Sequence, residues 1–355
     1  MKAPRLRQVG ILVVVAALLA GLAVVGLRWW TERDRTELQR AIDLAPGDGE
    51  RFSWTDWAAV RDELGVDLDA DSPSEEVTDF LDAAYGADLS SASALPESAQ
   101  LLHVQFGFSP ASADWELFSQ SAAGAVVMLH LPEDTDWDRI RSRITNLGYV
   151  EPDEADGVWN GGSDVLGRIG SGITPEVGYI ALDEEDSLVF TSDTRDYLAA
   201  AVDDAIGDGS SVTGLGDVVE ASGAPLSAAI YTGSHACGAL AMGQADPDDQ
   251  AQGEQLVRDA GEVNAYTGFA MSVQPGLHLR VAMSFESDDQ ARTNADTRAI
   301  LAAGPAPGQG GAFPDRFALG PVEADGRVIT LPLEPVEGSY VLSDLSTGPV
   351  LFATC

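Results

Sequence analysis

The short run GSHACG at 233–238 places a serine, a histidine and a cysteine within four residues, and these side chains serve as nucleophile and base in acyl transfer. Neighbouring residues of an extended chain point to opposite sides, and catalytic partners usually come from segments far apart in the sequence. The sequence also lacks the G-x-S-x-G pattern of a nucleophile elbow. We therefore expect no catalysis at Ser234, His235 or Cys237, and we predict that the protein is not an enzyme.

Two acidic runs, at 67–71 and 134–138, have the D-x-D-x-D spacing with which a calcium-binding loop begins. After the second run, Arg139 replaces the required glycine and Thr145 replaces the required glutamate, and the first run fails similarly. Carboxylates there suit the positive end of a helix. The DEED sequence at 183–186 predicts a solvated hairpin tip, with a weak divalent-cation site as the alternative. No metal site is expected.

Other reactive side chains are scarce or scattered. Lys2 is the only lysine, which leaves none beyond it for a phosphate-binding loop or a Schiff base. The four histidines show no H-E-x-x-H spacing, and the glycines at 161–172 lack the G-x-G-x-x-G order of a dinucleotide loop. The sequence predicts no bound cofactor. An enzyme would need a pocket that gathers His103 or His130 with acidic residues.

The chain has two cysteines, Cys237 and Cys355, separated by more than a hundred residues. On an oxidising face of a membrane, the simplest interpretation is one disulfide that fixes the C-terminal segment. Such a link stabilises the fold by about 4–5 kcal/mol in the chain-entropy description. Two free thiols are the alternative, because spacing alone does not show proximity. The predicted site residues are therefore this cysteine pair.

An uncharged run from Val9 to Leu27 indicates a membrane span. As a helix its nineteen residues cover about 28 Å, close to the thickness of the hydrocarbon core. Basic residues precede the run, and Trp29 and Trp30 follow it, as at a membrane interface. We predict a signal anchor in the cell membrane, with the C-terminal domain extracytoplasmic. A cleaved signal peptide is the alternative, because residues 21–23 fit the small-residue rule for cleavage.

The charge of the chain limits its partners. Its 355 residues include 20 basic and 57 acidic side chains, a formal net charge of −37. Beyond residue 40 the counts are 13 basic and 54 acidic. Such a surface repels phosphate backbones and anionic lipid headgroups, which excludes nucleic acid as a partner of this part. The simplest interpretation of the acidic excess is solubility, and 45% hydrophobic residues are enough to build packed cores.

The first hundred residues predict helices. Residues 31–45 mix charged and apolar side chains and are predicted to continue the anchor as a stalk, and 56–64 predict a short amphipathic helix. At 72–86, an S-x-x-E capping box, a proline at the first helical position and apolar residues at helical spacing up to Tyr85 predict a longer helix. A Ser/Ala-rich linker follows at 87–100.

From residue 101 the pattern changes. Alternating residues predict strands at 101–108 and 125–131, and the next predicted elements are a helix at 137–147, a glycine-rich surface excursion at 161–176, a hairpin at 177–192 and a helix at 193–206. Strand, helix, hairpin and helix then recur between 227 and 302, which indicates a duplicated β-α-β-β-α unit of the ferredoxin-like kind. The alternative is that acidic helices after hairpins resemble one another without duplication. The tail predicts strands at 328–333, 340–342 and 349–354.

The predicted fold class is α+β: an N-terminal transmembrane helix, a small helical membrane-proximal piece, two repeated ferredoxin-like units and a β-rich C-terminal tail. The predicted segments are residues 1–30 for the cytoplasmic tail and transmembrane anchor, 31–100 for the stalk and helical membrane-proximal segment, 101–213 for the first α+β unit, 214–304 for the second α+β unit, and 305–355 for the C-terminal strands.

Three functions fit these features. We expect foremost a single-pass, membrane-anchored extracytoplasmic protein whose ectodomain binds another envelope protein or acts as a scaffold, without catalysis. One alternative is a carrier of an apolar ligand or lipid, in a cavity lined by Phe106, Phe108, Ile180 and Phe269. The other is an enzyme with an unrecognised active site. Contact with the membrane through residues 9–27 is common to all three.

Overall fold

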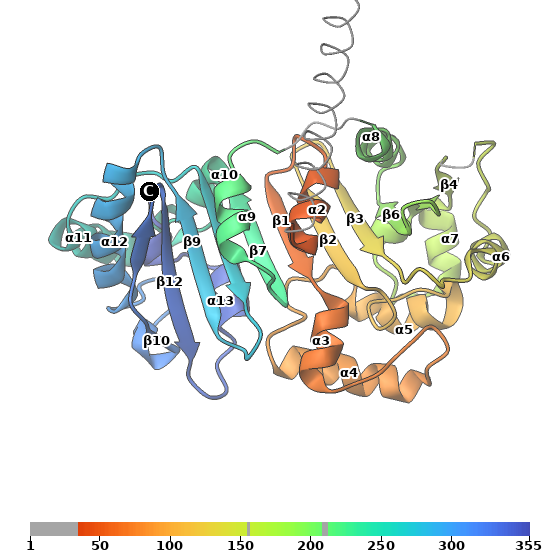
Figure 1. The fold of residues 1–355 in the computed structure, drawn as a ribbon, viewed down its shortest axis with the longest axis horizontal. Coiled ribbons are helices and arrows are strands. Elements are labelled where there is room, and N and C mark those ends of the chain that lie inside the picture. Colours follow the sequence, from red (N-terminus) through yellow and green to blue (C-terminus); the bar gives the residue numbers. More distant parts are fainter. Residues whose placement is uncertain (1–34, 155–156, 208–211) are drawn as a thin grey trace, which may run out of the picture.

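The structure is a computed structural model that describes residues 35–154, 157–207 and 212–355. The span predicted at residues 9–27 lies outside the described residues. Within the described ranges, no helix combines the length and the apolar character needed to cross a bilayer. This part of the chain is a mixed α/β fold built on one twelve-stranded sheet (Figure 1).

All neighbouring strands of the sheet are antiparallel. Their order is β10-β12-β9-β8-β7-β1-β2-β3-β6-β5-β4, and β11 also pairs with β12. The strands are β1 Arg51–Thr55, β2 Trp115–Gln120, β3 Ala125–His130, β4 Trp159–Asn160, β5 Tyr179–Asp183, β6 Leu188–Ser192, β7 Ser227–Thr232, β8 Gly268–Val273, β9 Leu279–Ser284, β10 Phe317–Leu319, β11 Glu323–Asp325 and β12 Val328–Pro335.

The α-helices of the described residues connect and cover these strands. They are α2 Glu37–Leu44, α3 Trp57–Leu64, α4 Ser74–Gly86, α5 Ala99–Leu101, α6 Trp137–Leu147, α7 Gly162–Ile169, α8 Arg195–Ile206, α9 Gly216–Ser222, α10 Gly233–Ala239, α11 Pro247–Ala260, α12 Asp288–Ala302 and α13 Val341–Thr347.

Strand β1 lies inside the sheet, where it pairs with β2 on one side and β7 on the other. Phe52 and Trp54 are buried on one face, and Ser53 and Thr55 alternate with them, which is the period of a strand. The sequence offers the alternation in RFSWT as a signal. The strand is not predicted, because it is only five residues long and the predicted helix at 56–64 follows it directly.

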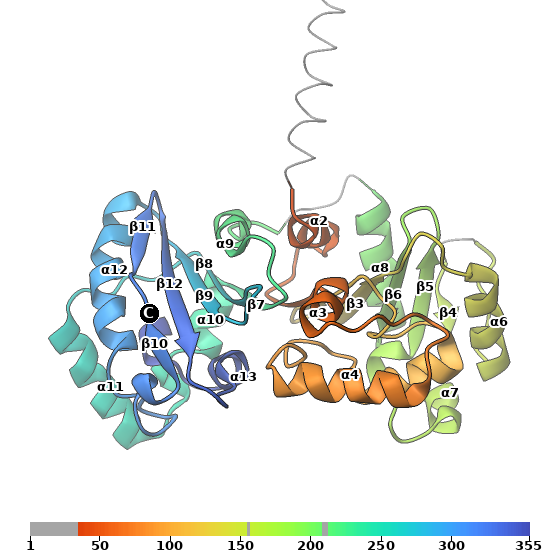
Figure 2. The same cartoon turned by 60° about the horizontal axis from the view of Figure 1, so that its bottom comes forward.

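The two faces of the sheet are covered unequally (Figure 2). Helices α2, α8 and α9 pack on one face, whereas a larger group that includes α3, α4, α10 and α13 packs on the other. On α2, Leu38, Ala41 and Ile42 form a buried stripe against α8 and α9. The prediction that this segment is a stalk is therefore wrong for residues 37–44, because its apolar stripe is buried against the body.

Several predicted elements are present at their predicted positions. The side chain of Asp56 caps α3 by accepting the N–H of Ala59, and α6 buries Ile140 and Ile144. The predicted hairpins are β5–β6 and β8–β9. Ser287, the predicted cap residue, caps helix α12 by accepting the N–H of Gln290. These elements have strong local signals, namely a cap residue, a period or a turn.

The predicted strand at 101–108 is instead helical. Helix α5 continues into a π-helical turn at Leu102–Phe106, which ends at Gly107 with a φ of 89°. Leu102 and Phe106 are both fully buried. Residues four apart share a face in a helix as well as in a strand, so their spacing does not distinguish the two structures.

Two segments predicted as irregular contain ordered structure. The glycine-rich excursion at 161–176 includes helix α7, which buries Val165. In the predicted linker at 87–100, Leu89 and Leu95 are fully buried. A few buried apolar side chains are therefore enough to pack each of these segments against the body.

The C-terminal tail contains one of its three predicted strands, β12. The other two segments form helix α13 and a single 3₁₀ turn at Leu351–Ala353. The ferredoxin-like repeats are not confirmed, because one continuous sheet takes strands from each of the segments 31–100, 101–213, 214–304 and 305–355. The divisions between those segments stay predictions.

Candidate functional site

The GSHACG run forms helix α10, so its side chains radiate around a helix axis instead of alternating along an extended chain. Cys237 is bonded to Cys355, with 5.7 Å between their Cα atoms. The imidazole of His235 stacks on the ring of Tyr231 with 5.9 Å between centroids, and its Nδ1 lies 3.7 Å from a carboxylate oxygen of Glu50. The cysteine therefore serves as a cross-link, and its thiol is not free to act as a nucleophile.

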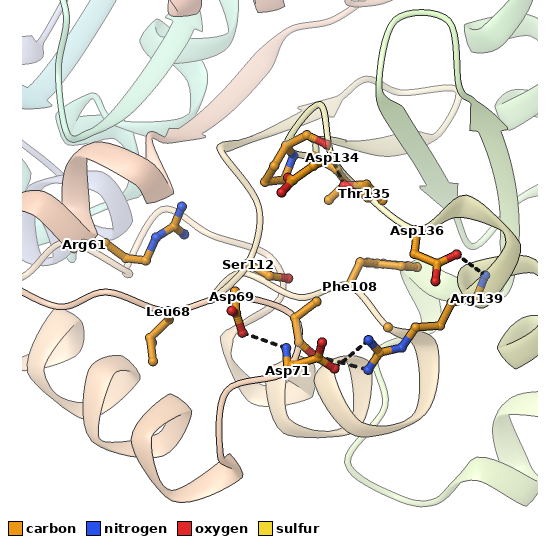
Figure 3. Close-up of a pocket in the computed structure, with 14 residues that line it drawn as sticks. Arg61, Leu68, Asp69, Asp71, Phe108, Ser112, Asp134, Thr135, Asp136 and Arg139 are labelled. Carbon is orange, nitrogen blue, oxygen red and sulfur yellow. Dashed lines mark hydrogen bonds and ion pairs between the residues drawn. The ribbon is translucent and has the colours of Figure 1, made fainter.

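The two acidic runs of the sequence meet at one pocket, which we call the acidic pocket (Figure 3). The loop between α3 and α4 contributes residues of the run 67–71, and the segment from β3 into α6 contributes residues of the run 134–138. The volume of the pocket is about 230 Å³. Its charged lining side chains are Asp69, Asp71, Asp134, Asp136, Arg61 and Arg139.

Hydrogen bonds and an ion pair fix the first acidic run. Asp69 accepts the N–H of Asp71 at 2.8 Å and the hydroxyl of Ser72 at 3.1 Å, and the first bond lowers the pKa of the Asp69 carboxyl. Asp71 forms an ion pair with Arg139 at 2.6 Å. Ser72 therefore orders this loop instead of capping α4, whose N-cap residue is Pro73.

The second acidic run begins helix α6, as predicted. Asp136 accepts the N–H of Arg139 at 3.0 Å, which satisfies a donor of the first turn. Asp134 is exposed and forms no hydrogen bond or ion pair within the described residues. Asp134 thus presents a free carboxylate to the acidic pocket.

Arg61 reaches the acidic pocket from α3 (Figure 3). Its Nη1 donates to the carbonyl oxygens of Ala111 at 3.0 Å and Ala113 at 2.8 Å, which fix the guanidinium. Burial lowers the pKa of Arg61, and the nearby carboxylates of Asp114 and Asp56 oppose this change. Its other nitrogens have no hydrogen-bond partner within the described ranges, so one edge of the guanidinium is available to a ligand.

The carboxylates of the described residues do not converge as metal ligands. Among these residues, no group of three or more His, Cys, Asp or Glu side chains is placed to hold a metal ion. At the tip of the β5–β6 hairpin, Asp183 accepts the N–H groups of Glu185 and Asp186, and Glu184 pairs with Arg141. The tip therefore uses its carboxylates to form a turn and a surface ion pair.

His130 ends β3, directly before the segment that lines the acidic pocket. Its Nδ1 lies 3.0 Å from a carboxylate oxygen of Asp114, and its ring stacks on Trp115 with 5.4 Å between centroids. His103 is only 6% exposed, and its Nε2 lies 2.8 Å from the carbonyl oxygen of Ser72. Of these two histidines, His130 is the one that the structure pairs with a carboxylate.

The side chains predicted to line an apolar cavity lie in the core. Phe106, Phe108, Ile180 and Phe269 are each at most 1% exposed. Phe106 packs edge-on against Phe108 and against Tyr149. Phe108 also lines the acidic pocket. Because all four side chains belong to the packed core, the arrangement counts against a lipid-sized cavity that they line.

Glu116 is a buried carboxylate that the sequence analysis does not single out. It lies on β2, is fully buried, and accepts hydrogen bonds from Trp57 Nε1 at 3.0 Å, Ser93 Oγ at 2.7 Å and the N–H of Ala94 at 2.7 Å. Burial raises the pKa of the Glu116 carboxyl, and the hydrogen bonds oppose the rise. This residue ties α3 and the loop before α5 to the sheet. A glutamate inside the apolar strand sequence WELF is the signal for it.

Arg298, on α12, is a fully buried cation. Its Nη1 donates to the carbonyl oxygens of Phe352 at 2.5 Å and Thr354 at 2.9 Å, and its Nη2 donates to that of Asn264 at 2.7 Å. The guanidinium lies 5.3 Å from the centre of the Tyr266 ring. Burial lowers the pKa of Arg298 to about 10. The residue fixes the C-terminal segment beside the disulfide.

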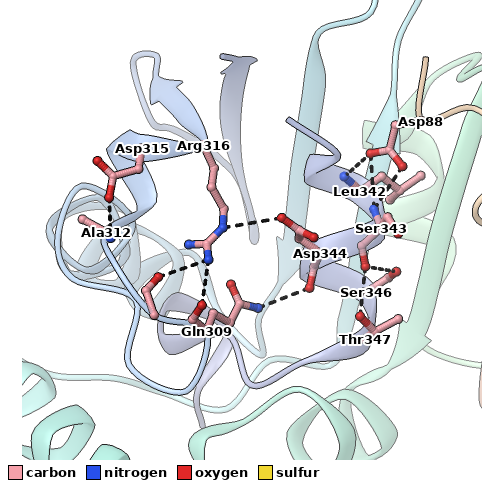
Figure 4. A network of polar contacts seen from close by, with 11 residues as sticks. Asp88, Gln309, Ala312, Asp315, Arg316, Leu342, Ser343, Asp344, Ser346 and Thr347 are labelled. Carbon is pink, nitrogen blue, oxygen red and sulfur yellow. Dashed lines mark hydrogen bonds and ion pairs between the residues drawn. The ribbon is translucent and has the colours of Figure 1, made fainter. Parts of the chain in front are cut away.

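Asp88 joins the end of α4 to helix α13 (Figure 4). Its carboxylate accepts the N–H of Leu342 at 2.7 Å and that of Ser343 at 3.3 Å, two donors in the first turn of α13. Burial raises the pKa of Asp88 to about 6. The residue has a φ of 58°, a conformation that aspartate adopts more readily than most residues.

No known protein family matches the sequence, and no curated protein matches it. A solved structure, crystal form I of TP0453, is similar to this chain at a TM-score of 0.37 and 5% sequence identity, over 86% of this chain and 96% of that chain. A similarity at this level carries no argument about function, so the functional case depends on the residues described above.

Proposed function

We propose that the protein is a single-pass, membrane-anchored extracytoplasmic binding protein whose acidic pocket receives a basic side chain of another envelope protein, without catalysis. The observation that carries this proposal is the meeting of two separated acidic runs around one pocket. The free carboxylate of Asp134 and the acidic surface around it attract cationic groups before contact, over about a Debye length.

The position of the acidic pocket suits an anchored protein. Ten residues lead from Leu27, the end of the proposed span, to Glu37 at the start of α2, and an extended chain of that length reaches at most about 35 Å. Helix α2, and with it the sheet face that it covers, therefore lies within about 35 Å of the end of the proposed span. Helix α3, which contributes Arg61 to the acidic pocket, packs on the opposite face (Figure 2). A partner protein approaches the pocket from the side away from the bilayer.

A basic peptide segment fits the chemistry of the acidic pocket. The carboxylates of Asp69 and Asp134 accept hydrogen bonds from an arginine or a lysine. The available edge of Arg61 donates to a main-chain carbonyl of the same segment. Exposed ion pairs contribute only about 0–1 kcal/mol each, so binding needs further contacts around the pocket and weakens as the salt concentration rises.

The test is site-specific cross-linking of the full-length protein in its membrane. A photoreactive amino acid replaces Thr135, which lines the acidic pocket, and in a matched control it replaces Ile300, which is 57% exposed on α12. We expect a protein adduct from position 135 that is lost in the Asp69→Asn/Asp134→Asn double variant. Equal adducts from both positions, or an adduct that persists in the double variant, would contradict the proposal.

The His130–Asp114 pair favours a second function, hydrolysis. A carboxylate at Nδ1 orients the imidazole and leaves Nε2 free to act as a general base. This alternative predicts that the detergent-solubilised full-length protein hydrolyses 4-nitrophenyl acetate, with activity lost in His130→Gln and kept in His235→Gln. Equal rates for wild type and His130→Gln would remove it.

A further inference from the structure

A groove on the α4 side of the sheet differs chemically from the acidic pocket. It has a volume of about 520 Å³ and is formed by the segments 85–98 and 171–175. Tyr85 lines this groove and is 64% exposed, although its helical spacing predicts a core position. We call it the serine groove because hydroxyl-bearing residues line both segments. They are Ser90, Ser91, Ser93, Ser98, Ser171 and Thr174.

Tyr85 belongs to an exposed aromatic pair. Its ring centre lies 5.7 Å from that of Tyr340, with an angle of 36° between the planes, and Tyr340 is 37% exposed. Tyr85 comes from α4, and Tyr340 directly precedes α13. Tyrosine combines a flat apolar face with a polar tip, and for this reason it is enriched at binding surfaces.

Partly buried hydrogen bonds fix the walls of the serine groove. The hydroxyl of Ser98 donates to the carbonyl oxygen of Gly172 at 3.1 Å and accepts the N–H of Thr174 at 2.8 Å, which joins the two segments. Glu116, on β2, accepts hydrogen bonds from Ser93 and Ala94 and so fixes this wall to the sheet. The groove is therefore formed before a ligand arrives, which lowers the entropic cost of binding.

The charge of the serine groove contrasts with that of the whole protein. Among the described residues that line it, Glu97 is the one with an ionised side chain. The acidic surface around the groove repels anionic polymers, and the groove itself offers a cationic ligand a single carboxylate. A neutral ligand rich in hydroxyl groups satisfies both conditions.

We infer that the serine groove binds a neutral saccharide chain, with one sugar ring packed on Tyr85. A pyranose ring presents a face of C–H groups to an aromatic ring, while its hydroxyl rim exchanges hydrogen bonds with serine hydroxyls and main-chain groups. The volume of about 520 Å³ lies within the range of about 300–1,000 Å³ of small-molecule sites. This inference does not depend on the function proposed for the acidic pocket.

A proline-rich peptide is the rival ligand, because such peptides dock on exposed aromatic side chains. Grooves of that kind hold a proline ring between aromatic walls. Here the rings of Tyr85 and Tyr340 contact each other at an angle of 36°, so a proline ring does not fit between them. The hydroxyls of Ser93 and Ser98 already donate to Glu116 and Gly172, so their oxygens can only accept from a ligand, and a saccharide supplies the hydroxyl donors that a proline ring lacks. The structure therefore favours the saccharide.

The test is saturation-transfer NMR and calorimetry on the full-length protein in detergent, with cellotetraose, maltotetraose and chitotetraose as probes. We expect at least one tetrasaccharide to bind, and Tyr85→Ala to weaken its affinity at least tenfold. Tyr85→Phe keeps the ring and should bind nearly as well as wild type. Val150→Ala is the matched control, because Val150 is 66% exposed at another place and should leave the affinity unchanged.

Each result decides the inference. Saccharide binding that depends on the ring at position 85 supports it. Absence of binding by all three tetrasaccharides overturns it, as does binding that Tyr85→Ala leaves unchanged. Acetylated decaproline is tested in parallel, and Tyr85-dependent binding of this peptide without saccharide binding would assign the groove to the rival ligand.

Discussion

Glu116 and Arg298 both have ionisable side chains and are fully buried, yet they hold different segments of the chain in place. Each lies among neutral hydrogen-bond partners: an indole, a hydroxyl and a backbone N–H around the carboxyl group, and three main-chain carbonyl oxygens and the side-chain oxygen of Asn294 around the guanidinium. An unpaired buried charge is costly unless such bonds satisfy it. At both sites, hydrogen bonds with neutral groups offset the cost of burying an ionisable side chain, which is acidic at one site and basic at the other.

The difference lies in what each charge holds. Glu116 fixes Ser93 and Ala94 of the serine groove and Trp57 at the start of α3, the helix that carries Arg61 into the acidic pocket. Arg298 fixes the segment 352–354, which the disulfide also holds. The half of the sheet from β2 to β6 thus shapes the two proposed binding surfaces, whereas the half from β7 to β12 secures the C-terminal segment.

The largest expected effect comes from cutting the covalent link in the second half. The Cys237→Ser/Cys355→Ser variant opens a loop of 118 residues, and we expect the free energy of unfolding to fall by about 4–5 kcal/mol. Urea unfolding followed by tryptophan fluorescence measures this change. The folded variant should keep its tetrasaccharide affinity. A loss of tetrasaccharide affinity in the folded variant would show that the two halves do not have separate roles.

Arg298→Met is the next largest change. It leaves the carbonyl oxygens of Phe352, Thr354 and Asn264 without their donor, and we expect a loss of about 3 kcal/mol in the free energy of unfolding. Arg298→Lys keeps a positive charge but has fewer hydrogen-bond donors, so its free energy of unfolding should lie between those of wild type and Arg298→Met. The same urea experiment compares them. A variant as stable as wild type would show that the buried guanidinium does not secure this segment.

Glu116→Gln tests the binding half. All three partners of Glu116 donate hydrogen bonds to its two oxygens. Glutamine replaces one of these oxygens with an NH₂ group, which cannot accept, so we expect the free energy of unfolding to fall by about 2 kcal/mol. Because the wall of the serine groove loosens, tetrasaccharide affinity should fall as well. Arg298→Lys is the control, since it lowers stability without touching the groove. If both variants affect binding equally, the division of roles is wrong.

Asp88, which links the two halves, gives the smallest effect and a dependence on pH. Burial raises its pKa to about 6, so between about pH 4 and 6 the folded protein binds the proton more tightly than the unfolded chain does. Its contribution to stability is present at low pH and is lost as the pH rises through 6, by roughly 1 kcal/mol between pH 5 and 7.

Thermal unfolding of wild type and Asp88→Asn at pH 5 and pH 7 checks this dependence. Other groups titrate equally in both proteins, so the difference between their pH dependences isolates Asp88. We expect a smaller change with pH in Asp88→Asn, while Asp134→Asn, at an exposed position, should behave as wild type. Equal pH dependence in wild type and Asp88→Asn would contradict the assignment.

The helices and hairpins that a few neighbouring residues encode can be predicted from the sequence. The Asp56 and Ser287 caps, the stripe of Ile140 and Ile144, and the turn residues of the two hairpins led to correct helices and hairpins. The strands predicted at 101–108 and 340–342 are instead helical, because short apolar runs fit either structure.

The sites depend on contacts that no local pattern contains. The acidic pocket needs the runs 67–71 and 134–138 to meet, and each run alone predicts only a turn or a helix start. Glu116 takes its partners from Trp57 and Ser93, on other segments. Such long-range convergence is set by the packing of the sheet, which is why the sequence predicts the residue types of the pocket without placing them together.

The proposed function depends most on the proposed anchored, extracytoplasmic placement of the described body, and the lysine content of the chain gives a direct test. Lys2 is the only lysine and precedes the proposed span, whereas Val150 is 66% exposed on the body. A membrane-impermeant amine-reactive label on intact cells should mark Val150→Lys and leave wild type unmarked, with wild type marked after permeabilisation. Labelling of wild type in intact cells, or of Val150→Lys only after permeabilisation, would contradict the account.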